Sequence, residues 1–319
     1  MQPNGMIFWD WNGTLMDDVD FTHGCLNWML ESHGYPQRYD LAQYRELFRF
    51  PIEDYYRLAG FDFSRHPYPM LAEHFMAHYN AGVDACPVMA HAVDTLTELA
   101  RRGWNVALHY RSNQAAARQV ERDILALGGT AKAYQADLTQ EAQVEALFAA
   151  AEGDFGFVEG LVNNAGTAWK GLFTDMTLGD WRQVLDADLT SVFLCCRRAL
   201  PPMIRRKRGS IVNVSSMWGQ VGASCEAAYS AAKAGVIGLT KALAQEEGPS
   251  GIRVNCLAPG VIDTPMNGDL SPEDVAALRE ETPLGRTGTP REAGEAIAYL
   301  LEAEFLTGQV LGLNGGMVV

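Results

Sequence analysis

From residue 101 onward, short apolar runs alternate along the chain with amphipathic stretches of helical length. The apolar runs are expected to be strands, and they lie at 106–110, 130–138, 157–164, 210–216, 252–260 and 309–314. The stretches between them are expected to be helices, at 113–127, 139–151, near 178–206, 226–248 and 291–302. This alternation predicts an α/β fold with a doubly wound, parallel, Rossmann-like sheet. Ligands of such sheets bind beyond the carboxyl ends of the strands.

The first hundred residues have a different pattern. Residues 6–15, MIFWDWNGTL, begin as an apolar strand that ends at Asp10. Residues 16–85 then have mostly helical character and are rich in aromatic residues and histidine. The pattern therefore predicts a helical insertion directly after the first strand of the sheet.

Tyr229 and Lys233 are four residues apart in AAYSAAKAG, and Ser216 lies thirteen residues before the tyrosine. Residues at this spacing share one face of a helix. A neighbouring ammonium favours the phenolate, so we expect Lys233 to lower the pKa of Tyr229 from about 10 toward neutrality. Such a phenol could exchange a proton with a carbonyl or alcohol, and the serine hydroxyl could hold the same oxygen. A tyrosine and lysine at this spacing can also be a core residue beside a surface residue.

Composition excludes several kinds of partner. The net charge is −14, so the chain has no basic excess with which to neutralise phosphates, and we expect no nucleic-acid partner. The sequence has no apolar run of about 18 residues, so we expect no membrane span. Six cysteines without a CxxC pair, and no signal-peptide pattern, are typical of a cytoplasmic protein with reduced thiols.

Four ordered motifs give the resemblance to a known family. They are GLVNNAG (160–166), GSIVNVSS (209–216), YSAAKAG (229–235) and IRVNCLAPGVIDTPM (252–266). Together they resemble the short-chain dehydrogenase/reductase family, particularly its 3-oxoacyl-carrier-protein reductase-like members, over about residues 99–319. The run from Gly209 to Met266 also resembles the elongation factor P 5-aminopentanone reductases. The resemblance implies reduction of a small or carrier-bound ketone with NADPH, by a homo-oligomer, usually a tetramer.

The resemblance assigns roles to the catalytic positions. Tyr229 would be the proton donor, Lys233 would lower its pKa and bind the nicotinamide ribose, and Ser216 would hold the substrate oxygen. The family has a fourth catalytic residue, an asparagine, and here Asp188 of LDADLTSVF stands in its place. Asp188 could ion-pair with Lys233 and change the pH profile, or it could be an ordinary helix residue.

Cofactor positions are also implied by the resemblance. Arg111 and Ser112 follow the second strand of the reductase pattern and favour NADP, because an arginine can pair with the 2′-phosphate; the alternative is an exposed turn. The other implied cofactor-binding residues, besides Tyr229 and Lys233, are Asp137 at the adenine, Asn163, Ala165 and Gly166 along the cofactor, and Pro259, Gly260, Ile262 and Thr264 at the nicotinamide.

The N-terminal part, about residues 1–108, resembles the haloacid-dehalogenase-like hydrolases. Asp10 matches their nucleophile, while Asn12 stands where a second aspartate is expected. The segment 16–85 resembles their helical cap. We therefore expect two parts: a hydrolase-like strand, cap and helix over 1–98, and a reductase-like domain over 99–319 without its own first strand. Strand 6–10 is expected to replace that strand, beside the second and fourth.

The fusion removes parts of both families. The chain contains no G-x-G triplet, so the reductases' glycine-rich turn is missing, and Asp10 to Gly13 stand in its place. Lost backbone donors and an unpaired charge each cost about 1–3 kcal/mol, so we expect weakened dinucleotide binding. Two alternatives stay open. One is a Mg²⁺-dependent phosphatase acting through Asp10, with Asp10 and Asn12 at the metal, and the other is an inactive chimeric scaffold.

Overall fold

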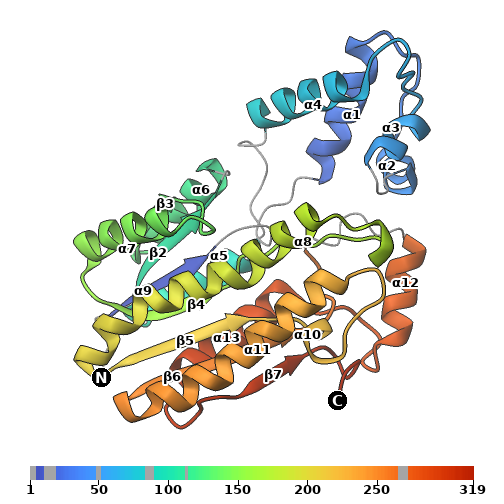
Figure 1. Ribbon diagram of the computed structural model, residues 1–319. Helices are drawn as coiled ribbons and strands as arrows, with labels where there is room; N and C mark the ends of the chain where they lie inside the picture. Colours follow the sequence, from blue (N-terminus) through green and yellow to red (C-terminus); the bar gives the residue numbers. More distant parts are fainter. Residues whose placement is uncertain (1–4, 11–18, 48–51, 83–89, 112–113, 265–271) are drawn as a thin grey trace.

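Seven parallel strands form one sheet in the order β3-β2-β1-β4-β5-β6-β7 (Figure 1). The computed structural model describes residues 5–10, 19–47, 52–82, 90–111, 114–264 and 272–319. The strands are β1 Met6–Asp10, β2 Asn105–Tyr110, β3 Thr130–Gln135, β4 Val158–Asn163, β5 Gly209–Val214, β6 Ile252–Pro259 and β7 Val310–Leu313. The predicted doubly wound α/β fold is confirmed.

Strand β1 occupies the middle of the sheet. Ile7 pairs with Val106 of β2 on one side and with Gly160 of β4 on the other. Met6, Ile7 and Phe8 are fully buried. A side chain at position 160 would come within 2.9 Å of Ile7, so the glycine lets the two strands pack closely. The expectation that residues 6–10 lie between the second and fourth strands is therefore confirmed.

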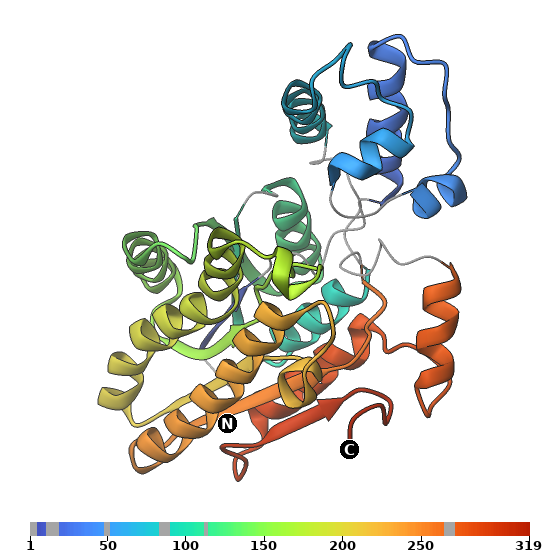
Figure 2. The same ribbon diagram turned by 45° about the vertical axis from the view of Figure 1, so that its right-hand side comes forward.

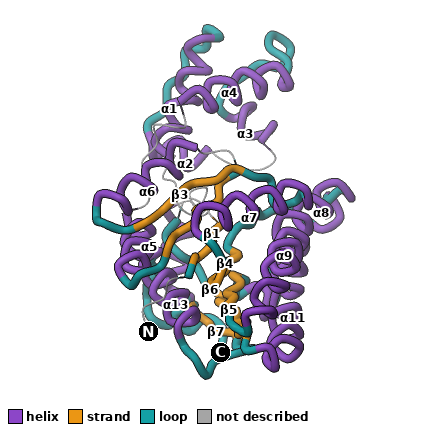
Figure 3. Tube along the Cα trace, turned by 90° about the vertical axis from the view of Figure 1, so that its left-hand side faces the viewer, coloured by secondary structure: helices purple, strands orange, loops and turns teal. Residues whose placement is uncertain are grey.

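Helices cover both faces of the sheet (Figure 3). One face carries α5 (Ala90–Arg101), α6 (Gln114–Ala126) and α13 (Pro290–Glu302). The other carries α7 (Glu141–Phe155), α9 (Ser191–Arg206) and α11 (Ala227–Glu247). Each layer encloses its own apolar core against the strands, which buries both faces of the parallel sheet.

The helix expected near 178–206 is divided. Helix α8 (Leu178–Leu185) starts with a capping box between Thr177 and Asp180. A π-helical turn, η3 (Asp186–Thr190), separates α8 from α9. Such turns are common at functional sites. The sequence did not predict this interruption, nor the short elements α10 (Trp218–Val221), α12 (Pro272–Glu281), η2 (Phe173–Asp175) and η4 (Gly248–Ser250).

The predicted helical insertion after β1 contains four helices. They are α1 (Val19–Ser32), α2 (Leu41–Leu47), α3 (Ile52–Leu58) and α4 (Tyr68–Gly82). Figures 1 and 2 show them as a group apart from the sheet and its helices. Their apolar core is also separate, and its fully or nearly fully buried members include Leu26, Met29, Leu30, Tyr55, Tyr56 and Leu71. We call these four helices the cap.

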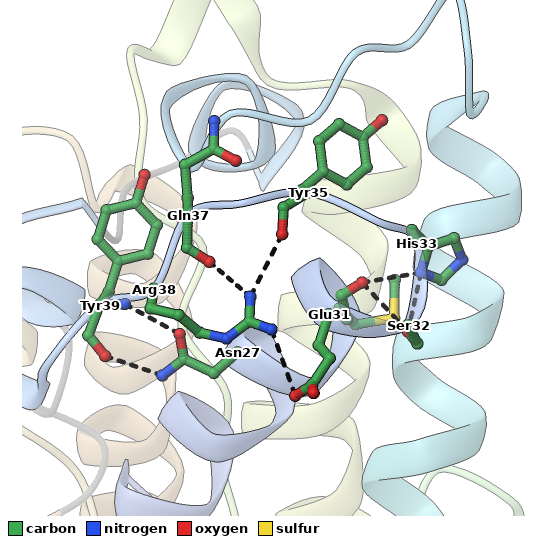
Figure 4. Close-up of polar contacts among 9 residues, drawn as sticks. Asn27, Glu31, Ser32, His33, Tyr35, Gln37, Arg38 and Tyr39 are labelled. Carbon is green, nitrogen blue, oxygen red and sulfur yellow. Dashed lines mark hydrogen bonds and ion pairs between the residues drawn. The ribbon is translucent and has the colours of Figure 1, made fainter.

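Polar contacts hold the cap segment that links α1 to α2 (Figure 4). Asn27 on α1 donates to the carbonyl of Tyr39 at 2.8 Å and accepts from the Tyr39 amide at 3.0 Å. Arg38 donates to the carbonyl of Gln37 at 2.7 Å and lies 3.3 Å from the Glu31 carboxylate. These contacts satisfy backbone groups that the segment leaves outside regular structure.

Candidate active site

A cavity of about 290 Å³ opens at the carboxyl ends of β5 and β6. Ser216, Tyr229 and Lys233 line it together with apolar side chains that include Val214, Leu257, Ile262 and Ile297. This is the edge at which ligands of parallel α/β sheets bind. The cavity brings together the three residues that the sequence singled out as an acid–base cluster.

Two elements position the cluster. Ser216 follows the end of β5, and its hydroxyl accepts a hydrogen bond from the Trp218 amide at 3.1 Å. Tyr229 and Lys233 lie on the first two turns of α11, one turn apart on the same face. Ser216 and Tyr229 both line the cavity, and Ser216 is close enough to lower the pKa of the Tyr229 phenol, so both hydroxyls can meet one substrate oxygen.

Lys233 is buried beneath the tyrosine. Its ammonium lies 5.5 Å from the centre of the Tyr229 ring and donates to the carbonyl of Val214 at 3.1 Å. The same nitrogen is 3.1 Å from Oδ1 of Asp188. An ammonium has three N–H groups, so beyond the Val214 carbonyl and the Asp188 carboxylate at least one N–H can reach a ligand in the cavity.

Asp188 is fully buried in the π-helical turn η3. Its Oδ2 accepts a hydrogen bond from the Thr167 amide at 3.0 Å. Oδ1 faces Lys233 as an ion pair rather than as a well-directed hydrogen bond, because this oxygen accepts no hydrogen bond from the described residues. Of the two interpretations of Asp188, the structure therefore favours the ion pair over the ordinary helix residue.

The predicted lowering of the Tyr229 pKa is wrong. Burial raises the pKa of this phenol above its ordinary value, Lys233 only partly offsets the effect, and Asp188 adds to it. Burial also lowers the pKa of Lys233, but Asp188 and Tyr229 more than compensate, so the lysine pKa is raised. The spacing of Tyr229 and Lys233 could not reveal either the burial or the opposing carboxylate.

The cavity contains all the residues that the resemblance assigns to the nicotinamide, and one of those that it assigns along the rest of the cofactor. Its lining includes Gly166, Pro259, Gly260, Ile262 and Thr264. Asn163 does not line it: the Asn163 amide donates to Asn213 at 2.8 Å within the buried sheet. Asn164, which the sequence analysis did not select, lines the cavity instead. Side chains alternate between the faces of a strand, and this parity separates the two asparagines.

The residues that the resemblance assigns to the 2′-phosphate and adenine lie at the same edge of the sheet, beyond β2 and β3. Arg111 is exposed directly after β2. Asp137 follows β3, and its carboxylate accepts hydrogen bonds from the amide and hydroxyl of Thr139 at 3.0 and 2.7 Å. Ala165 packs partly buried against the core on the α9 face. Ser112, Asn12 and the Asp10 side chain lie outside the described residues.

Several cavity residues were not expected from the sequence. Thr95 and Leu96 come from α5, before residue 99, where the sequence analysis placed the start of the reductase resemblance. Lys170 and Glu226 contribute charged groups. No group of histidine, cysteine, aspartate and glutamate side chains in the described residues is arranged to hold a metal ion. Within the same residues, no helix is both long and apolar enough to cross a membrane.

The strand order and the Ser–Tyr–Lys cluster define a nucleotide-binding type of α/β fold with an acid–base site. Residues 92–318 match the family model described as enoyl-(acyl carrier protein) reductase. The chain therefore belongs to this family, which is part of the short-chain dehydrogenases/reductases, and is an oxidoreductase by class.

Curated relatives agree with this assignment. The 3-oxoacyl-[acyl-carrier-protein] reductase FabG of Staphylococcus aureus is 39% identical over 222 residues, which cover 69% of this chain and 90% of the relative. The uncharacterized oxidoreductase YmfI of Bacillus subtilis is 40% identical over 221 residues, which cover 68% and 90%. Among solved structures, a putative gluconate dehydrogenase from Agrobacterium tumefaciens superposes with a TM-score of 0.67 at 31% identity, over 70% of this chain and 90% of that one.

Proposed function

We propose that this oxidoreductase is an NADPH-dependent carbonyl reductase that acts on 3-oxoacyl thioesters or similar ketones. The observation that carries the proposal is that Ser216, Tyr229 and the buried Lys233 line one cavity at the β5 and β6 ends. The names of the carrier-protein reductases among the relatives support the substrate class.

Each residue of the cluster has a defined task. The Ser216 hydroxyl donates to the substrate carbonyl oxygen and fixes its position beside Tyr229. Tyr229 then transfers its hydroxyl proton to that oxygen as the alcohol forms, and the phenolate recovers a proton from solvent. Lys233 stabilises the phenolate through its positive charge. General acid catalysis of this kind contributes about 10²- to 10⁴-fold in rate.

The cavity fits the nicotinamide and ribose half of a dinucleotide. When bound, this cofactor supplies the hydride that reduces the carbonyl carbon. The remaining N–H of Lys233 and the Tyr229 hydroxyl suit the ribose hydroxyls, while Val214, Leu257 and Ile262 offer an apolar wall for the ring.

We extend the proposal to the rest of the cofactor path. Gly166, Pro259, Gly260, Ile262 and Thr264 would line the nicotinamide end, Asn163 and Ala165 would contribute backbone at the β4 end, and Asp137 would face adenine. Arg111 and Ser112 would select NADP through the 2′-phosphate, because a guanidinium binds phosphate in a bidentate manner.

We also propose that residues 1–98 share their origin with the haloacid-dehalogenase-like hydrolases. Support comes from the strand ending in Asp10 and from the helical cap that follows it. The family match begins at residue 92 and lends no support to hydrolase chemistry in the residues before it. Reductase chemistry at the α11 site is therefore the function that we favour for the whole chain.

A rate comparison tests the proposed function. We expect the purified chain to oxidise NADPH when a 3-oxoacyl thioester is added, and Tyr229→Phe to lower kcat about 10²- to 10⁴-fold. Tyr299→Phe is the matched control, because Tyr299 is an exposed residue of α13 and should leave the rate unchanged. Equal rates for Tyr229→Phe and the unmodified chain would refute the mechanism.

A further inference from the structure

A carboxylate is built into the acid–base cluster. Asp188 is fully buried, and its Oδ1 lies 3.1 Å from the ammonium of Lys233, which is almost fully buried itself. A charge pair that is removed from water is screened little by solvent or salt. The charge of an ionised Asp188 therefore reaches the groups around Lys233 with little screening. Burial raises the pKa of this carboxyl, and Lys233 opposes that rise.

The backbone fixes this arrangement. The π-helical turn η3 places Asp188 beneath the loop after β4, where the Thr167 amide holds its Oδ2. A Cβ atom at position 166 would lie 2.4 Å from Oδ1 of Asp188 and 3.1 Å from the lysine nitrogen. Only glycine at position 166 leaves room for the pair. The loop after β4, the turn η3 and the helix α11 therefore all contribute to holding Asp188 beside Lys233.

The pair changes what Lys233 can do for Tyr229. A lone ammonium favours the phenolate, and an ammonium paired with a carboxylate favours it less, because the carboxylate opposes part of its effect. Consistent with this geometry, the Tyr229 pKa is raised by burial, and Asp188 adds to the shift that Lys233 opposes. The other titratable or charged groups that face the cluster are Glu226 at the start of α11, Cys256 of β6 and Lys170 of the cavity wall.

We propose that Asp188 is a positioning residue that offsets part of the charge of Lys233 and so keeps the phenolate of Tyr229, and with it rapid alcohol oxidation by this site, at alkaline pH. Oxidation requires the phenolate of Tyr229 to accept the hydroxyl proton of the alcohol, while the hydride passes to an oxidised nicotinamide dinucleotide. Reduction requires the protonated phenol, which persists across neutral pH. The inference rests on the proposed function for its kinetic consequence, but the charge pair itself does not.

The first test is spectroscopic and needs no turnover. The ultraviolet absorbance of tyrosinate is followed with pH, and the difference between the unmodified chain and Tyr229→Phe isolates one phenol. We expect no Tyr229 phenolate below about pH 9, since an ordinary tyrosine already titrates near 10. In Asp188→Asn, compared with Asp188→Asn/Tyr229→Phe, the phenolate should appear at lower pH.

Asp186→Asn is the matched control. Asp186 lies in the same π-helical turn but is exposed, so its loss removes an equal charge without touching the pair. Its titration should coincide with that of the unmodified chain. Identical titrations for Asp188→Asn and the unmodified chain would overturn the inference. Should Asp188→Asn fail to fold, the unmodified chain still decides, because a Tyr229 phenolate near neutral pH would overturn it as well.

The second test is the pH profile of secondary-alcohol oxidation with NADP⁺. The profile of Asp188→Asn should be displaced to lower pH, and each unit of displacement raises the rate below the midpoint roughly tenfold. A merely structural role for Asp188 would lower the rate without displacing the profile. If the unmodified chain turns over no ketone or alcohol, the proposed function fails. The tyrosinate titration still tests whether Asp188 raises the pH at which the Tyr229 phenolate forms.

Discussion

Lys233 packs beside Gly166, which follows a different strand, β4. Its missing side chain leaves the space in which Asp188 and Lys233 meet. At the residue scale, the site is therefore a contact between β4, η3 and α11 as much as a motif on one helix.

Gly166→Ala should disturb this contact. The new methyl group would overlap Oδ1 of Asp188, so we expect a loss of about 1–3 kcal/mol in the free energy of unfolding. Thermal and chemical denaturation measure it. Gly153→Ala, at an open position of α7, is the control and should stabilise by about 0.5–1 kcal/mol. Equal effects of the two substitutions would contradict the packing described for position 166.

At the residue scale, the sequence predicts those features that depend on residues close together along the chain. The spacing of Tyr229 and Lys233, with Ser216 at the end of a strand, was enough to bring the three together. Sequence reasoning failed for the Tyr229 pKa, because burial and the charge of Asp188 act through space. It also selected Asn163 rather than Asn164 for the cavity, since only the strand boundary decides which side chain faces it.

At the element scale, helix α5 joins the two ends of the chain. It packs against α13 so closely that a Cβ at Gly294 would lie 2.0 Å from the Thr95 hydroxyl. Thr95 and Leu96 also reach the cavity. The family match begins at residue 92 and therefore includes this wall of the cavity, whereas the expected boundary at residue 98 separated it from the reductase part.

Gly294→Ala should therefore separate α5 from α13. We expect a destabilisation of about 1–3 kcal/mol from overpacking, measured by chemical denaturation. Gly24→Ala on α1 meets no neighbour within 4 Å and serves as the control. A Gly294→Ala protein as stable as the unmodified chain would show that the two helices are not in this contact.

The four helices of the cap are expected to lose stability at alkaline pH. Burial raises the pKa of Tyr55 far above its ordinary value, with smaller contributions from Tyr44 and Tyr56, and burial likewise raises that of Tyr56. Because these folded-state pKa values exceed the unfolded ones, the stability that they reflect is fully present below about pH 10 and is lost as pH rises further. We expect the cap to open at alkaline pH.

A short protease pulse followed by mass spectrometry measures this opening. Above pH 10, cleavage should increase within residues 19–82. In Tyr55→Phe the increase should begin at higher pH, although loss of the hydrogen bond with Tyr44 costs about 1 kcal/mol at neutral pH. Cleavage that is independent of pH, or unchanged by the substitution, would contradict the role assigned to the buried phenols.

At the scale of the whole molecule, a strand from outside the reductase motifs completes the reductase sheet. The alternating pattern from residue 101 onward predicted six of the seven strands, and the apolar run ending at Asp10 predicted the seventh. The sequence did not indicate the π-helical turn or α12. Neither element changes the spacing of apolar residues enough for its boundaries to be predicted.

We expect the chain to assemble through α9 and α11 into a tetramer, which light scattering would report as four times the chain mass. Phe193 on α9 is 45% exposed, so it is accessible to a partner subunit at this face. Phe193→Glu should dissociate the assembly. Leu125→Glu, at an exposed position of α6 on the opposite face, should not. A monomer for the unmodified chain would exclude this arrangement.

A reductase site in this sheet requires that the chain bind a nicotinamide dinucleotide although it lacks the glycine-rich turn. Titration of the whole chain with NADPH and with NADH, followed by nucleotide fluorescence, measures it directly. We predict saturable binding of both, tighter for NADPH, and weaker binding of NADPH to Arg111→Ala. A complete absence of saturable binding for either nucleotide would contradict the central claim that this sheet holds a working reductase site.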